Sequence, residues 1–360
     1  MTKLTTALVH EFRAARESGA GGRRFQAILP MNRCLGLQDS IVSGNGMFHA
    51  RLSEDGVFRV LRGADAASER GCLWDSRRAG PGGRFFALVQ SDGNFCVYRG
   101  DDLSANQGWQ WGTQMTADGG QFYAVLRDNG EFSICRGSGP TNFGGVVWST
   151  GVTDPVRAID EVVRIDYDLD GAEIVQSRPS DLYRETVRNN SAQAQTSLIT
   201  GSVTVSDTAG WQDELGSAAA CSLEIKSRIP IMVDGKVILT AEAAHPFTRN
   251  GATTTAKTWG FNAPAAVQAN SSMMCLVSAM RTTITVPYTM SGLFTLESGV
   301  QVSGTIGGTY TGANCHDLAV TLTTFDLGPD ESYSVTRPLS PMPLIIGPST
   351  QHPANASSYF

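Results

Sequence analysis

The chain has 360 residues, 17% of them charged, with a formal net charge of −6 at pH 7 and an isoelectric point near 5.4. This length allows two or three domains, and the acidic balance argues against nucleic acid as a partner. No apolar run reaches the roughly 20 residues that a membrane-spanning helix needs, whereas glycine, serine and threonine are abundant, as in proteins built from strands.

Residues 1–24 are predicted to form an amphipathic helical extension. Leu4, Leu8 and Phe12 recur at helical spacing, with charged residues between them. The stretch has no continuous apolar core of the kind found in a secretory signal peptide. We therefore expect a cytoplasmic or non-classically secreted protein that acts at the membranes of target cells.

Seven cysteines share no common spacing. The chain has no C-x-x-C motif and no set of cysteines and histidines at the spacing of a zinc site. We therefore expect free thiols, no metal and no other cofactor.

A 37-residue repeat dominates residues 25–153. Each copy begins with a phenylalanine and ends with a tryptophan, at Phe48, Phe85 and Phe122 and at Trp74, Trp111 and Trp148. Within each copy two alternating runs flank a corner that contains glycine, such as Asp92-Gly93, which predicts a β-hairpin. One hairpin cannot bury its own apolar face, so we expect the three to close around a common axis that the tryptophans fill.

The middle copy reads QSDGNFCVY and places polar side chains at alternate positions. Because alternate positions of a strand project to one face, these side chains form one row. Its members are Gln90, Asp92, Asn94, Cys96 and Tyr98. Amide, carboxylate and phenol groups can together hydrogen-bond the hydroxyl groups of a sugar. The other copies have lost the row, which reads Ser53, Asp55, Val57, Arg59 and Leu61 in the first and Arg127, Asn129, Glu131, Ser133 and Cys135 in the third.

The repeat and the row together resemble the bulb-type mannose-binding lectins, a three-fold β-prism II family with the motif Q-x-D-x-N-x-V-x-Y. The resemblance covers 25–153 and implies that the middle copy binds mannose-containing glycans. Cys96 stands where the family has a valine that packs on the carbon face of the sugar, and it is of similar size. The alternative is that QSDGN is only the turn-rich edge of a structural prism.

The repeat stops near Asp154-Pro155. Residues 157–195 are more charged and predict a strand or short helix that enters a second domain. From Ser197 to Thr324, segments rich in threonine and serine and broken by glycines predict long strands. The tail, 329–360, is rich in proline, which favours an extended strap.

Within this second domain, 216–245 reads as two arms of alternating apolar and polar residues around an apolar tip, Ile229–Gly235. Each arm has about the 9–11 residues that a tilted strand needs to cross a bilayer, and period-two alternation is typical of transmembrane barrel strands. The residues predicted to insert are Leu223, Ile225, Ile229, Ile231, Met232, Val233, Val237, Leu239 and Ala241. The residues predicted to line the lumen are Glu224, Lys226, Arg228, Lys236, Thr240 and Glu242. An amphipathic hairpin packed on a protein core would alternate in the same way.

The order of segments around this hairpin resembles the aerolysin-like β-pore-forming proteins. GSVTVSDTAGWQDELG precedes the hairpin, and GATTTAKTWGF and TTITVPYTMSGLFTL follow it. The resemblance covers 154–328 and implies an elongated, twisted β-sheet module with a tucked prestem hairpin. The expected fold is therefore all-β, with a β-prism II domain followed by this module.

The two resemblances imply a lectin-targeted pore-forming protein, acting as a toxin or defence cytolysin. It would be a soluble monomer or dimer that binds mannose-type glycans on cell surfaces, assembles into a ring on the lipid membrane and inserts a β-barrel. One alternative is a non-lytic mannose-binding agglutinin whose second domain is structural. Another is a carbohydrate-active enzyme, but the hairpin carboxylates Glu224 and Glu242 have no further catalytic signature beside them, so no enzyme activity is expected.

Overall fold

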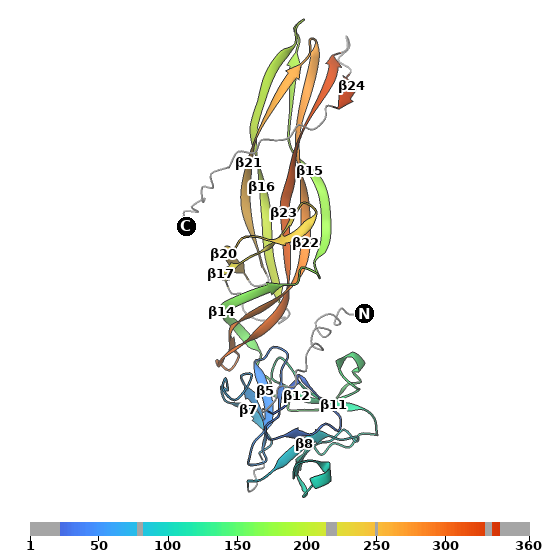
Figure 1. Ribbon diagram of the computed structural model, residues 1–360, viewed down its shortest axis with the longest axis vertical. Helices are drawn as coiled ribbons and strands as arrows, with labels where there is room; N and C mark the ends of the chain where they lie inside the picture. The colour runs from blue at the N-terminus through green and yellow to red at the C-terminus, as the bar shows by residue number, and fades with distance from the viewer. Residues whose placement is uncertain (1–21, 78–81, 214–221, 249–250, 328–332, 339–360) are drawn as a thin grey trace. The chain divides into compact units, whose positions relative to one another are not determined.

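The computed structural model describes residues 22–77, 82–213, 222–248, 251–327 and 333–338 (Figure 1). These residues form strands and two short 3-10 turns, η1 (Leu103–Ala105) and η2 (Pro140–Asn142), so the predicted all-β fold is confirmed. Positions 1–21 of the expected N-terminal helix lie outside the described residues. No helix in the described ranges is both long enough and apolar enough to span a membrane.

The chain divides into two compact units. The first contains Met1–Asp166, Asp213–Cys221 and Thr289–Gly308, and the second contains Tyr167–Gln212, Ser222–Tyr288 and Thr309–Phe360. All three repeats lie in the first unit, together with short segments from the second half of the sequence.

Each repeat folds as the predicted hairpin and adds a third strand. The strands are β5 (Phe48–Leu52), β6 (Phe58–Arg62) and β7 (Cys72–Asp75), then β8 (Phe85–Val89), β9 (Phe95–Arg99) and β10 (Trp109–Gly112), then β11 (Phe122–Leu126), β12 (Phe132–Arg136) and β13 (Val146–Ser149). Within each repeat all neighbouring strands are antiparallel. The three repeats therefore make three separate sheets.

The segment before the first repeat supplies one further strand to each sheet. These strands are β2 (Ile28–Pro30) beside β11, β3 (Leu35–Gly36) beside β8 and β4 (Ser40–Val42) beside β5. A fourth strand, β1 (Arg24–Gln26), pairs in parallel with β4. The segment thus joins all three sheets, which the sequence did not indicate because strands of two or three residues are too short to show alternation.

Aromatic side chains fill the axis between the three sheets, as expected. Phe58, Phe95 and Phe132 pack with ring centroids 4.8 to 5.2 Å apart. The three terminal tryptophans form a second layer, with centroids 5.8 to 6.3 Å apart and edge-to-face geometry. This geometry suits the charge distribution of aromatic rings, and it gives each hairpin the apolar partner that it lacks alone.

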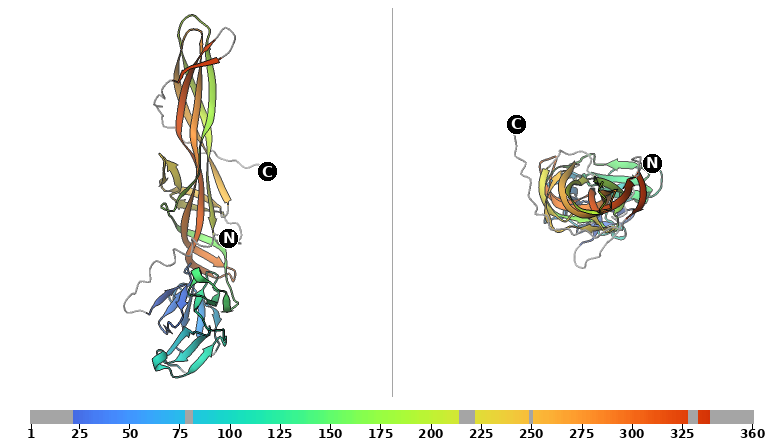
Figure 2. Two further views of the ribbon diagram at one scale, coloured as in Figure 1. Left: turned by 90° about the vertical axis from the view of Figure 1, so that its right-hand side faces the viewer. Right: turned by 90° about the horizontal axis from the view of Figure 1, so that it is seen from above.

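Long strands form a further sheet, whose members lie side by side and twist around one another (Figure 2). Its order is β14-β22-β23-β16-β21, with β15 also pairing with β22 and β24 with β23. The strands are β14 (Val156–Tyr167), β15 (Glu173–Asn189), β16 (Gln195–Asp213), β21 (Gly251–Val267), β22 (Ser271–Leu296), β23 (Gln301–Leu327) and β24 (Tyr333–Pro338). The segment 157–195 is therefore built from strands rather than a helix, and part of the proline-rich tail forms a strand on β23.

The core of the second unit gathers alternate apolar residues of its long strands. Ile199 and Val203 of β16, Phe261 and Ala265 of β21 and Val277 of β22 are all buried in one cluster. Period-two burial along β21 and β22 follows from the threonine-rich alternation in the sequence.

The predicted prestem segment is one interrupted hairpin. Its base pairs β17 (Ser222–Ser227) with β20 (Ala243–Thr248), and its distal part pairs β18 (Pro230–Val233) with β19 (Lys236–Leu239). Between the two parts, two outgoing residues face three returning ones, which is a bulge.

The tip of this hairpin is shorter than the sequence suggested. Only Asp234 and Gly235 form the turn, with φ values of +47° and +73°. An Asp-Gly pair suits a two-residue turn with positive φ at both positions, so the four residues before it are free to pair as β18. The expected seven-residue apolar tip, Ile229–Gly235, is therefore wrong as a loop, because most of it is strand.

Candidate carbohydrate site and hairpin

The polar row of the middle repeat starts at the corner between β8 and β9. The Gly93 N–H donates to the Gln90 carbonyl over 3.1 Å, and Gly93 has a φ of +80°. The Asp92 carboxylate accepts the Asn94 backbone N–H at 3.0 Å, which fixes the Asp92 side chain at the corner. Gln90, Asp92, Asn94 and Tyr98 are all half-buried, so a ligand can reach them.

Hydrogen bonds join the members of this row to one another. The Gln90 amide donates to the Tyr98 hydroxyl at 2.9 Å, and the Cys96 thiol donates to the Gln90 carbonyl oxygen at 3.3 Å. Thr113 of the segment after β10 donates to Asn94 Oδ1 at 2.8 Å. The structure therefore brings together all five predicted residues, with orientations set before any ligand arrives.

The Cys96 thiol lies beneath the row rather than on its surface. The residue is only 1% exposed. Burial raises the pKa of the thiol, and hydrogen bonds from Tyr98 and Trp109 oppose that rise. The uncharged thiol connects Gln90, Tyr98 and Trp109, and the four half-buried side chains form the surface that a sugar would meet.

Trp109 was not singled out from the sequence. It pairs with Tyr98 across β9 and β10, and its side chain hydrogen-bonds to the Cys96 thiol. The same position in the other two copies holds Cys72 and Val146. The sequence does contain one indication of its role: among the three repeats, only the copy with the intact polar row has an aromatic residue at this position.

The row of the first repeat is filled by its own side chains. Arg59 donates to both carboxylate oxygens of Asp55, at 3.0 and 2.7 Å, and this pairing lowers the pKa of the carboxyl group. Asp55 is the equivalent of Asp92, and Arg59 is the equivalent of Cys96. The carboxylate that could bind a hydroxyl group is therefore already bound by an arginine.

The row of the third repeat carries an ion pair. Arg127 Nε lies 3.4 Å from a Glu131 carboxylate oxygen, at the positions of Gln90 and Asn94. Ser133, at the position of Cys96, is fully buried. This row lacks the donor and acceptor order of the middle one.

The base of the prestem hairpin packs on aromatic residues of the second unit. Phe247 of β20 is fully buried, and its ring centroid lies 5.5 Å from that of Trp211 on β16. The Trp211 indole N–H donates to the Tyr167 hydroxyl at 2.9 Å, and Tyr167 also hydrogen-bonds to Ser227 of β17. Both strands of the base are thus held on one aromatic cluster.

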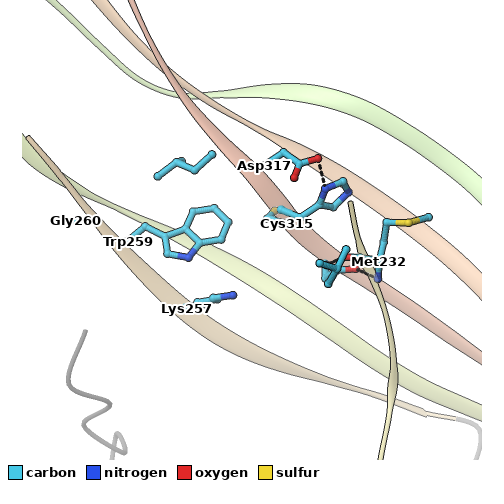
Figure 3. Close-up of a pocket in the computed structure, with 10 residues that line it drawn as sticks. Met232, Lys257, Trp259, Gly260, Cys315 and Asp317 are labelled. Carbon is cyan, nitrogen blue, oxygen red and sulfur yellow. Dashed lines mark hydrogen bonds and ion pairs between the residues drawn. The ribbon is translucent and has the colours of Figure 1, made fainter. Parts of the chain in front are cut away.

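The distal part of the hairpin is held by one amide side chain. The Met232 N–H donates to Asn314 Oδ1 at 3.0 Å, and Asn314 Nδ2 donates to the Met232 carbonyl at 2.8 Å. Beside this contact is a cavity of about 260 Å³, lined by the hairpin, by Lys257 and Trp259 of β21 and by His316 and Asp317 of β23 (Figure 3). The packing beneath the distal hairpin is therefore incomplete.

The residues predicted to enter the membrane are mostly covered. Ile225 and Met232 are buried, Ala241 is exposed, and the others are half-buried, namely Leu223, Ile229, Ile231, Val233, Val237 and Leu239. The charged residues predicted to line the lumen are all exposed, namely Glu224, Lys226, Arg228, Lys236 and Glu242, and Thr240 is half-buried. In this structure Ile225 and Met232 therefore point to protein and the charged residues point to solvent. Ile231 and Val233 pair with Ile238 and Lys236, so they lie on the face opposite to Met232, and the prediction of one continuous apolar face is wrong for the distal part.

The described ranges contain no group of three His, Cys, Asp or Glu side chains that could hold a metal ion. Cys34, Cys72, Cys96, Cys135, Cys275 and Cys315 are free, as expected, and Cys221 lies outside the described residues.

No protein-family model matches the chain, and the comparison with curated proteins gives no match. Among solved structures, a monomeric monocot mannose-binding lectin from Gastrodia elata is 17% identical, over 35% of this chain and 96% of its own, with a TM-score of 0.28. The parasporin-2 toxin of Bacillus thuringiensis, which recognizes cancer cells, is 18% identical over 45% and 72%, with a TM-score of 0.29. Lamprey immune protein is 16% identical over 84% and 96%, with a TM-score of 0.37. The solved structures similar to this chain thus include both groups that its sequence resembles.

Proposed function

We propose that the chain is a mannose-type glycan-binding, pore-forming protein. The observation that carries the proposal is the presence, in one chain, of an intact and accessible polar row and of a docked hairpin that buries apolar side chains and exposes charged ones. Its lectin domain would bring the protein to glycan-bearing membranes, and its hairpin would enter them.

In the proposed sugar site, Asp92 and Asn94 accept and donate hydrogen bonds to neighbouring hydroxyl groups of one mannose ring. Gln90 adds a contact, and the Tyr98 hydroxyl binds a further oxygen. The internal hydrogen bonds of the row support this role, because side chains that are already oriented lose less freedom when a ligand binds.

Binding to a surface glycan would raise the local concentration of the protein and favour its assembly into a ring. Each subunit would then release its hairpin and contribute two strands to a common barrel. The barrel must close, because an open sheet edge in lipid leaves backbone groups without partners.

Release of the hairpin exposes Ile225, Met232 and Phe247, at a cost of about 1.5–3 kcal/mol for each buried side chain. Insertion of the apolar face into lipid offsets that cost, since the same side chains leave water again. The lumen row carries three positive and two negative charges, at Lys226, Arg228, Lys236, Glu224 and Glu242, so we expect weak ion selectivity.

The proposal is tested by dye release from vesicles with and without a mannosylated lipid. We expect release only from the mannosylated vesicles, together with ring-shaped particles in negative-stain images. Tight binding to these vesicles without dye release would contradict the pore and leave a non-lytic agglutinin.

The glycan step is tested by Asp92→Ala. Loss of this carboxylate removes hydrogen bonds to the sugar at about 1–3 kcal/mol each, so retention on immobilised mannose should fall at least about tenfold. Asp55→Ala is the matched control, because Arg59 already occupies Asp55. Equal loss of retention in both variants would contradict the choice of the middle row.

A further inference from the structure

Trp109 places a large exposed aromatic side chain beside the proposed sugar site. Its side chain is 42% exposed although it lies within a strand. In the β9–β10 pair it stands opposite Tyr98, so the two side chains are neighbours on one face of the sheet. The indole therefore continues the surface formed by the polar row.

The position of the indole is fixed by contacts around Gly112. A Cβ atom added to Gly112 would lie 3.0 Å from Cys96 Sγ, 3.2 Å from Trp109 Nε1 and 3.3 Å from Asn94 Oδ1. The three side chains thus meet above this glycine, and any larger residue would push them apart. Together with its hydrogen bond to the Cys96 thiol, this packing holds the nitrogen edge of the indole against the row.

A structural role alone does not account for this residue. The tryptophans of the axis occur in all three repeats, as a shared packing role requires. The position of Trp109 holds Cys72 in the first repeat and Val146 in the third, and those repeats fold into the same hairpin. Trp109 therefore occurs together with the intact polar row, and the fold of the repeat does not require an aromatic residue at its position.

We propose that Trp109 forms a second carbohydrate subsite, which binds the pyranose ring linked to the sugar in the polar row. This subsite rests on the proposed glycan binding. An exposed indole offers a broad apolar face, and its natural partner is a sugar ring that presents axial C–H bonds, and no axial oxygen, on the face that meets it. β-linked gluco-configured rings meet this condition on both faces because their substituents are equatorial. In α-linked mannose the axial 2-hydroxyl interrupts one face and the axial linkage oxygen interrupts the other. The occupant is therefore a gluco-configured residue such as N-acetylglucosamine, β-linked to mannose.

Calorimetric titration of the full chain with three defined sugars tests the subsite. These are methyl α-mannoside, a disaccharide of N-acetylglucosamine β-linked to mannose, and α-linked dimannose. The wild-type chain should bind the disaccharide that contains N-acetylglucosamine about three- to tenfold more tightly than methyl α-mannoside, because one aromatic contact contributes about that much affinity. Trp109→Ala should bring the ratio of these two affinities close to one, and Trp109→Phe should keep most of it because the apolar face remains.

A matched control is Phe143→Ala in the third repeat, whose ring is 54% exposed and lies far along the chain from the row. We expect it to leave both affinities at wild-type values. The proposed subsite would be contradicted if Trp109→Ala left the ratio of the two affinities unchanged. It would also be contradicted if the wild-type chain gained as much affinity over methyl α-mannoside with α-linked dimannose as with the N-acetylglucosamine disaccharide. If the wild-type chain bound none of the three sugars, the proposed glycan binding itself would fail.

Discussion

At the scale of single residues, three hairpins of the same fold differ in what fills one row of positions. Arg59 binds Asp55 in the first, Arg127 lies beside Glu131 in the third, and the middle row stays open. The sequence identified the open row, because the motif and the repeat occur together. It did not reveal the place of Cys96 under the row or the proximity of Trp109, since both depend on pairing between strands.

His49 gives the first repeat a pH-dependent contribution to stability. It occupies the position held by Phe86 and Tyr123 in the other repeats. It is buried, its Nδ1 lies 2.7 Å from the Gly63 carbonyl oxygen, and burial lowers its pKa below the usual value of 6.5.

The unfolded chain therefore binds a proton at His49 more readily than the folded chain as the pH falls below about 6.5. Stability from this residue is present above that pH and is lost below it, by up to about 1.4 kcal/mol per pH unit. We expect His49→Phe to flatten the dependence of the free energy of unfolding on pH between about 6.5 and 5, as measured by urea denaturation. Parallel curves for the two proteins would contradict this role.

At the scale of elements, alternation in the sequence was enough to predict the hairpins of the three repeats and the hairpin of the second unit. It did not reveal the joining strands at 24–42, which are too short to show a period, or the two-residue turn at Asp234-Gly235. The partners of the prestem hairpin could not be predicted either, because Asn314 and Trp211 are distant in sequence from Met232 and Phe247 and follow no shared motif.

A disulfide between the hairpin and the strand beneath it should block membrane activity. Met232 and Asn314 meet through two hydrogen bonds, so we would combine Met232→Cys with Asn314→Cys in a Cys72→Ser background to remove the exposed thiol. The oxidised protein should bind mannose and release no dye, and reduction should restore release. Each single substitution serves as a control for the loss of the native contact.

This outcome depends on the hairpin leaving its place on β23 before it acts. If the fully oxidised protein released dye at the wild-type rate, the hairpin would have no part in permeabilisation. Mannose retention measured on the same samples separates a blocked hairpin from a misfolded chain.

At the scale of the whole molecule, Asp154 ties the repeats to a turn of the long sheet within the first unit. Arg62 of the first repeat donates to its carboxylate at 2.6 Å, and the Ser298 N–H and hydroxyl donate at 2.8 and 2.6 Å. In the third repeat the equivalent arginine, Arg136, stacks on Phe122 at 5.0 Å. Of these two equivalent arginines, Arg62 therefore has a buried acidic partner, whereas Arg136 has an aromatic one.

We expect Asp154→Ala to lower the free energy of unfolding by about 3–5 kcal/mol, because it leaves the Arg62 charge largely buried without that partner. Arg136→Met is the matched control and should cost about 0.5–1 kcal/mol. Urea denaturation followed by the fluorescence of the axis tryptophans measures both. A loss for Asp154→Ala no larger than that of the control would show that the contact is dispensable.

The account as a whole depends on which face of the hairpin meets lipid. Ala241 and Glu242 are adjacent, lie between β19 and β20, and are both exposed in this structure. A lysine at either position should therefore leave the soluble fold unchanged. In a barrel the two side chains point to opposite faces, so that Ala241 meets lipid and Glu242 meets water.

The most direct measurement is conductance and reversal potential in mannosylated planar bilayers for Ala241→Lys and Glu242→Lys. We predict that Ala241→Lys binds mannose and melts like the wild type but gives no conductance, because a lipid-facing lysine costs up to about 2–4 kcal/mol in every subunit. Glu242→Lys should conduct, with its reversal potential shifted toward anion selectivity. Normal conductance by Ala241→Lys, or an unchanged reversal potential for Glu242→Lys, would contradict a barrel built from this hairpin.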